Sequence, residues 1–141
     1  MTGMTYSLTQ IRTAMTTTIR NSIPGLIVYR SVEEMTEVPC AILEPRFADF
    51  DGAMQGGDHV WHFYCYIMVS RTEPFYAYQK LDGYITGKGS TSIPQAIEDT
   101  PNLGLDDSVF AHCYGMKDYG GSFSSAAINH IGAVLMITVH S

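Results

Sequence analysis

The stretch from His59 to Val69 constrains the fold more than any other part of this 141-residue chain. Nearly every position in it is apolar or aromatic, so both alternating sets of side chains are non-polar. Successive side chains of a strand point to opposite faces, and the pattern therefore predicts a strand without a truly polar face. We expect both faces to be covered, either by the chain itself or by a neighbouring molecule.

Three helices are predicted around this strand. The Ser-x-x-Gln pattern at 7–10 is a capping box, and apolar side chains follow it at helical spacing as far as Ile19. Pro74 suits the first turn of a second helix, which the glycines at 87–90 end. The sequence at 92–95, Ser-Ile-Pro-Gln, caps a short third helix that runs to about Asp99.

Further strands are predicted at 26–30, 38–43, 109–116 and 128–140. Pro39 and Pro45 place the 38–43 strand near a sheet edge or at strand ends, because proline cannot donate to the ladder. The glycine-containing segments Pro45–Asp58 and Asp118–Ala127 are predicted as long connections.

The order of these elements contains few parallel crossover units. It predicts an α+β fold, with a mostly antiparallel β-sheet and two to three helices packed on one face. We expect a single domain over residues 1–141, because the sequence shows no linker and no internal repeat.

Composition argues against several classes of protein. The net charge is −6 with only 8 Lys and Arg, whereas a dedicated nucleic-acid binder needs cations to neutralise phosphates. Residues 1–10 lack the pattern of a signal peptide, and no apolar run is long enough to span a membrane, so we expect a soluble, intracellular chain. Cys40, Cys65 and Cys113 are widely spaced and are interpreted as buried, reduced thiols.

No motif indicates catalysis, a metal or a cofactor. His59 and His62 stand three apart on a strand and therefore point to opposite faces. Cys113 and His112 are adjacent and diverge for the same reason. The stretch Gly87–Thr91 lacks the spacing of a phosphate loop and follows a predicted helix rather than a strand. We expect the chain not to be an enzyme.

The two glycine-containing segments are the candidate contact regions. Aromatic side chains on such segments supply a large contact area when a partner covers them. The candidate interface residues are Phe47, Phe50, Asp51, Met54, Tyr119 and Phe123.

Several short stretches follow one another in order along nearly the whole chain: Ile23–Tyr29, Phe50–Met54, Gln79–Ile85, Gly89–Leu103 and Asp118–Gly121. This succession resembles the tail terminator proteins of long-tailed phages with flexible tails, particularly those that infect actinobacteria. The resemblance implies a six-membered ring that caps the tail tube at its head-proximal end and ends tube polymerisation. It also implies three partners besides further copies of the chain: the tail tube protein, the head-completion protein and the passing genomic DNA, which is not bound sequence-specifically. The location implied is the head–tail junction of the virion, after assembly in the host cytoplasm.

Two alternatives stay open. The first is another head–tail connector component, such as a head-completion or stopper protein. The second is a small cytosolic enzyme or ligand-binding α+β domain with a pocket on the open sheet face. The residues that would line such a pocket are Tyr64, Tyr66, His62, His112 and Tyr114.

Overall fold

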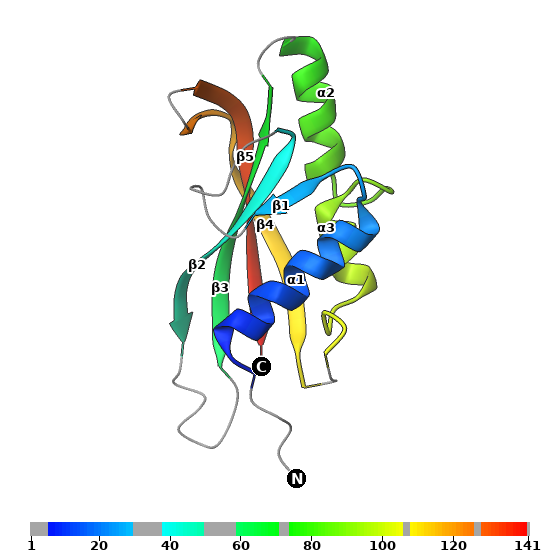
Figure 1. The fold of residues 1–141 in the computed structure, drawn as a ribbon, viewed down its shortest axis with the longest axis vertical. Coiled ribbons are helices and arrows are strands. Elements are labelled where there is room, and N and C mark those ends of the chain that lie inside the picture. Colours follow the sequence, from blue (N-terminus) through cyan, green and yellow to red (C-terminus); the bar gives the residue numbers. More distant parts are fainter. Residues whose placement is uncertain are drawn as a thin grey trace.

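A computed structural model of the chain describes residues 6–29, 38–49, 59–70, 74–105, 108–125 and 128–140. They form a five-stranded sheet and three helices, which confirms the predicted α+β fold (Figure 1). In chain order the elements are α1 (Leu8–Ser22), β1 (Ile27–Tyr29), β2 (Cys40–Asp49), β3 (Val60–Val69), α2 (Pro74–Ile85), α3 (Ile93–Asp99), β4 (Phe110–Ser125) and β5 (Ile128–His140).

The strand order is β1-β2-β3-β5-β4, and only the β1–β2 pair is parallel. The short strand β1 pairs with Cys40–Ile42 alone. Beyond Ile42 the outer side of β2 is therefore a sheet edge within the described part of the chain. Pro45 lies in this stretch, so the prediction that proline marks an edge is correct locally.

The predicted connection Pro45–Asp58 is wrong for residues 45–49, which continue β2. A register shift lies between Pro45 and Phe47, after which Phe47 pairs with His62 and Asp49 with Val60. The bulge absorbs one extra residue and lets the ladder resume beyond the proline. Residues 50–58 lie outside the described residues.

The predicted connection Asp118–Ala127 is also wrong for residues 118–125, which belong to β4 and pair with β5 in a long hairpin. Two register shifts interrupt this pairing, one between Cys113 and Gly115 and a larger one between Lys117 and Gly121, where three residues of β4 face one residue of β5. Asp118 and Gly120 have positive φ angles of 55° and 74° at this point. The backbone bends as in a turn, but the pairing continues on the far side of the bulge.

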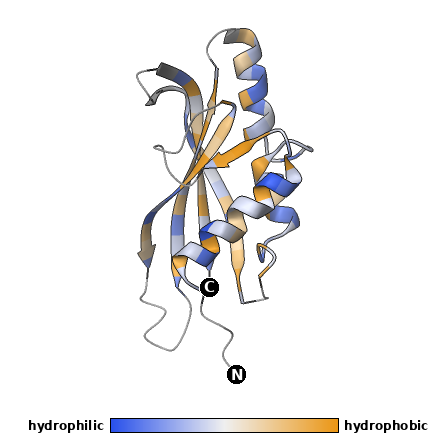
Figure 2. Cartoon of the chain, in the orientation of Figure 1, coloured by the Kyte–Doolittle hydropathy of each residue, from blue (hydrophilic) through white to orange (hydrophobic). Residues whose placement is uncertain are grey.

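The main hydrophobic core lies between the three helices and one face of the sheet. The capping box is present at Ser7, whose side chain accepts from the backbone N–H of Gln10, and α1 buries Ile11, Met15 and Ile19 completely. In Figure 2 the strands at the centre of the sheet are mostly hydrophobic, whereas α1 and α2 carry residues of both kinds. Amphipathic helices of this type are held by packing of their apolar stripe.

Side chains on the two faces of β3 are buried to different extents. Phe63, Cys65 and Ile67 are fully buried in the core beneath the helices. On the opposite face Tyr64 and Tyr66 are only half-buried. The expectation that both faces are covered therefore holds for one face within the described residues, and only in part for the other.

Candidate protein interface

The sheet face opposite the helices, here called the open face, carries aromatic and charged side chains. The register of the strands places them in rows that cross the sheet. One row runs from Phe47 through His62 and Thr138 to His112. The aromatic and charged side chains of the open face include Glu44, Arg46, Phe47, His62, Tyr64, Tyr66, Phe110, His112 and Lys117.

Phe47 stands at the β2 edge of the open face and is 59% exposed. Its ring stacks on His62, with 3.9 Å between ring centroids and 13° between ring planes. His62 Nδ1 is buried and has no hydrogen-bond partner among the residues that the structure describes. Phe47 is thus an exposed aromatic side chain that its neighbour holds in place, which suits a contact with a partner.

The centre of the open face is a cluster around Tyr64. The guanidinium carbon of Arg46 lies 5.2 Å from the ring centroid, and Nζ of Lys117 lies 4.1 Å from it. A hydrogen bond to Glu44 raises the pKa of Arg46, and a hydrogen bond with Tyr64 raises the pKa of Lys117. Both groups are therefore cations at neutral pH, and their stems and charges cover the tyrosine ring.

Tyr119 lies in the bulge of β4 and is 46% exposed. Its hydroxyl donates to Asp82 on α2, and its ring packs beside Tyr78 with 5.9 Å between centroids. The hydrogen bond to Asp82 is also the main cause that raises the pKa of Tyr119. The sequence prediction placed Tyr119 in a long connection between strands, whereas the structure places it on β4 and bonds it to Asp82 of α2.

The structure does not bring Phe47 and Tyr119 together. Phe47 shares a row with Thr138 of β5, whereas Tyr119 lies level with Ala133. Five residues of β5 separate these levels, which corresponds to about 17 Å along the sheet. The two residues therefore belong to different surfaces.

The other candidate residues are placed in part or not at all. The backbone of Phe123 pairs with His130 in the β4–β5 hairpin, but its side chain lies outside what the structure describes. Phe50, Asp51 and Met54 also lie outside the described residues. Their proposed contact role stays a prediction.

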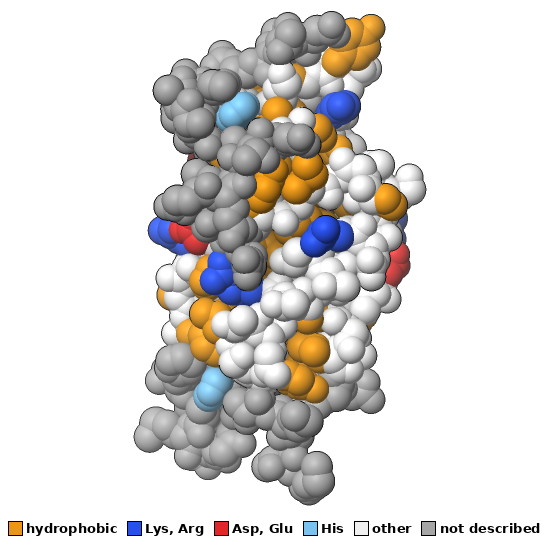
Figure 3. Space-filling view, in the orientation of Figure 1, with side chains coloured by type: hydrophobic (Ala, Val, Ile, Leu, Met, Phe, Trp, Pro, Cys, Tyr) orange, Lys and Arg blue, Asp and Glu red, His pale blue; other side chains and the backbone are white. Residues whose placement is uncertain are grey.

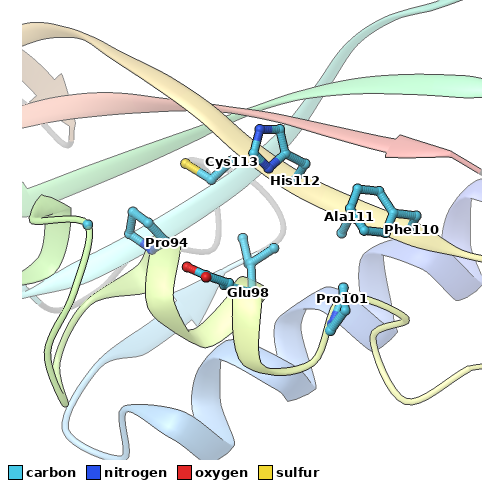
Figure 4. A pocket seen from close by; sticks show the side chains of 9 residues that line it. Pro94, Glu98, Pro101, Phe110, Ala111, His112 and Cys113 are labelled. Carbon is cyan, nitrogen blue, oxygen red and sulfur yellow. The ribbon is translucent and has the colours of Figure 1, made fainter.

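Sequence reasoning named His112 and Tyr114 on β4 only as pocket residues and did not predict that Phe110 and Met116 are exposed as well. Phe110 is 53% exposed, Tyr114 50% and Met116 43%. A groove of about 420 Å³ lies between this strand and α3, and its lining includes Ile97, Glu98 and His112. Figure 4 shows Glu98 on one side of the groove and His112 and Cys113 on the other. The sequence signal for this exposed surface was the repetition of large apolar residues at Phe110, Tyr114 and Met116.

The groove holds no activated nucleophile. Burial raises the pKa of the Cys113 thiol to about 11, and Cys113 pairs with Ile137 on the core side while its neighbour His112 pairs with Thr138 on the open face. A thiol that stays protonated is a poor nucleophile. Cys40 and Cys65 are buried and unpaired, and burial raises the pKa of each thiol as well.

The five residues predicted to line a ligand pocket lie in different surroundings. Phe47 covers His62, and two cations cover Tyr64, while His112 lines the groove beside α3 instead. Within the described ranges no group of three or more His, Cys, Asp or Glu residues is arranged to hold a metal ion.

The side of the molecule seen in Figure 3 exposes several hydrophobic patches and few charged side chains.

None of the helices in the described ranges is long and apolar enough to cross a membrane. The sequence matches no protein-family model and no curated protein.

Proposed function

We propose that this chain is a structural virion protein that forms a ring at the head-proximal end of a phage tail. In that place it ends polymerisation of the tail tube and joins the tail to the head-completion protein. The observation that carries the proposal is a pair of unlike surfaces on opposite edges of the sheet. One edge presents Phe47 on β2, and the other presents Phe110 and Tyr114 beside the α3 groove.

Two unlike surfaces suit a closed ring. In a ring each subunit meets the next through a heterologous contact, so one patch must fit a different patch of the neighbour. Interface centres are enriched in aromatic residues, which contribute large contact area with little loss of side-chain freedom. The resemblance to tail terminators supports six copies and supports the position between the tube and the head.

The chemistry of the described residues supports a role without catalysis. Cys113, His112 and Glu98 are the closest approach to a catalytic set, and they share the groove between α3 and β4. The thiol is protonated at neutral pH because burial raises its pKa. In this proposal these residues serve a surface that contacts protein.

Genomic DNA passes through such a ring without sequence-specific contacts. The net charge of −6 supports this use, because negative charge near a bore repels phosphates and lets the DNA slide. The partners proposed are therefore other copies of the chain, the tail tube protein, the head-completion protein and the transiting DNA. The proposed location is the virion, reached from the host cytoplasm.

Cryo-electron microscopy of particles that contain the chain tests the proposal. We expect a six-membered ring stacked between the tail tube and the head-completion protein. A ring of another order, or a place elsewhere in the particle, would contradict the tail terminator assignment. A place one level nearer the head would favour the alternative, a head-completion or stopper protein. A purified chain that turns over a small substrate would instead favour the enzymatic alternative.

A further inference from the structure

We infer that the outer surface of α2 binds a protein segment in which an apolar side chain is followed by a carboxylate. The apolar side chain enters a pocket beside α2, and the carboxylate meets Lys80. The inference goes beyond the proposed function and does not rest on it, because this surface is separate from both sheet edges. It lies beside the beginning of β2 and the end of β3, whereas Phe47 and Phe110 lie near the opposite end of the sheet.

Exposed aromatic side chains surround the first half of α2. Phe75 is 70% exposed and Tyr76 61%, and their ring centroids are 5.8 Å apart. On the other flank of the helix, Tyr78 packs beside the half-exposed Tyr119 of β4. With about 200 Å² for each side chain, the exposed parts of Phe75, Tyr76 and Tyr119 amount to roughly 350 Å². On a monomer, a patch of this size commonly marks a contact site.

The spacing of residues on α2 shows that this exposure is not needed for folding. Residues three or four apart in a helix lie on the same side. Ala77, Leu81 and Tyr84 share the side that packs into the core, and they are buried. Tyr76 and Lys80, also four apart, share a flank that is exposed. A flank that met only solvent would carry polar side chains throughout.

A pocket lies beside this flank. It has a volume of about 230 Å³, and its lining includes Val38, Val69, Tyr76, Ala77 and Lys80. Apart from Lys80, these side chains are apolar or aromatic. The volume is below the range typical of small-molecule sites, but it has room for one aliphatic or aromatic side chain. The pocket therefore suits the anchoring side chain of a protein segment better than a free metabolite.

Lys80 supplies the charge that selects the segment. Its side chain is exposed and makes no hydrogen bond or ion pair with the residues that the structure describes. Asp82, two residues further along α2, accepts a hydrogen bond from Tyr119 instead. Figure 3 shows hydrophobic side chains and a basic one together at the end of the molecule where α2 lies in Figure 1. A carboxylate beside the anchoring side chain gives Lys80 a partner, and such complementarity fixes the register of a contact.

The helix that carries this surface is held in place by the chain itself. Leu81 is fully buried beneath it, and the bond between Tyr119 and Asp82 ties its outer flank to β4. Gly120 lies so close to Tyr78 that a Cβ at this position would approach the tyrosine hydroxyl to 3.3 Å. A partner therefore meets a surface that needs little ordering, which lowers the free-energy cost of binding.

Fluorescein-labelled peptides test the inference on the full chain by fluorescence polarisation. The probes carry Leu-Asp-Glu or Phe-Asp-Glu between Gly-Ser pairs, and two controls carry Ser-Asp-Glu and Leu-Lys-Lys. Loss of the anchor should weaken binding by at least about tenfold, as expected for one buried leucine. Replacement of the carboxylates by lysines should weaken it by about two- to fivefold, as expected for exposed charges.

Two variants locate the site. Lys80→Glu should weaken the acidic probes and favour Leu-Lys-Lys, whereas Lys88→Glu should leave this preference unchanged. Lys88 is the matched control, because it is exposed in the turn after α2 and its replacement changes the net charge equally. Tyr76→Ser should weaken both probes because it removes a wall of the pocket, and thermal melts check that this exposed position leaves the fold intact.

Several results would overturn the inference. Equal binding of all four peptides, or no binding at millimolar concentration, would show that the pocket selects no such segment. Equal effects of Lys80→Glu and Lys88→Glu would show attraction by net charge alone. Binding of 4-phenylbutyrate as tight as that of the peptides would assign the pocket to a small carboxylic acid. Self-association that Tyr76→Ser abolishes, without peptide binding, would assign the surface to a second copy of the chain.

Discussion

Replacing Phe47 of β2 or Phe63 of β3 by alanine distinguishes a proposed contact residue from a core residue. Phe47 is 59% exposed, whereas Phe63 is fully buried. A phenylalanine side chain of about 200 Å² that is two-fifths covered hides about 80 Å², which is worth about 2 kcal/mol at 25 cal/mol per Å². Alanine keeps part of that cover, so we expect Phe47→Ala to lower the free energy of unfolding by roughly 1–2 kcal/mol. Phe63→Ala should cost about 3–5 kcal/mol, because it opens a cavity in the core.

Urea denaturation with linear extrapolation measures both losses, and an unchanged slope shows that the unfolding transition is the same. Formation of the proposed ring is then followed by sedimentation and by electron microscopy of the particles. We expect Phe47→Ala to fold and to fail in assembly, and Phe63→Ala to fail in both. The reasoning is refuted if Phe47→Ala loses as much stability as Phe63→Ala, or if it still gives normal rings and tails.

Two further predictions concern Tyr119 and the thiols. Tyr119→Phe removes a hydrogen bond to Asp82 between exposed groups and should lower the free energy of unfolding by less than about 1 kcal/mol, as judged by urea denaturation; a larger loss would mean that the bulge depends on this bond. The Cys113 pKa is about 11 in the folded chain and about 8.5 in an unfolded one, so the unfolded state binds fewer protons between these values and stability falls as pH rises through that window. The fall should be smaller in Cys113→Ser than in the unchanged chain, and identical curves for the two would refute the assignment.

Local signals were enough to predict α1 and β3. The Ser7–Gln10 capping box marks the first residue of α1, and the apolar spacing after it marks the buried stripe. The run from Val60 to Val69 carries the alternation of a strand in its own sequence. Pro45 also predicted an edge correctly, because a missing donor is a property of the residue itself.

The second halves of β2 and β4 could not be predicted from local sequence signals. Each continues beyond a bulge, at Pro45/Phe47 and at Lys117/Gly121, where proline, glycine and polar residues resemble a turn. The partner strand supplies the pairing that overrides these local preferences. The groove was out of reach for a related reason, since α3 and β4 form it together and neither sequence segment contains it.

The pattern of burial and exposure on the open face favours protein contacts at its edges. A sheet face that simply meets water alternates polar side chains, but this one carries Tyr64 and Tyr66 at its centre. Arg46 and Lys117 lie over the Tyr64 ring, so the chain already covers its central aromatic side chain with its own cationic ones. Phe47 at the edge keeps more than half of its surface exposed. A partner buries new apolar surface when it covers Phe47. At the centre of the face it would first have to displace Arg46 and Lys117, which already lie over the Tyr64 ring. The edges of the sheet are therefore the parts of this face where a neighbouring molecule would cover the most exposed apolar surface.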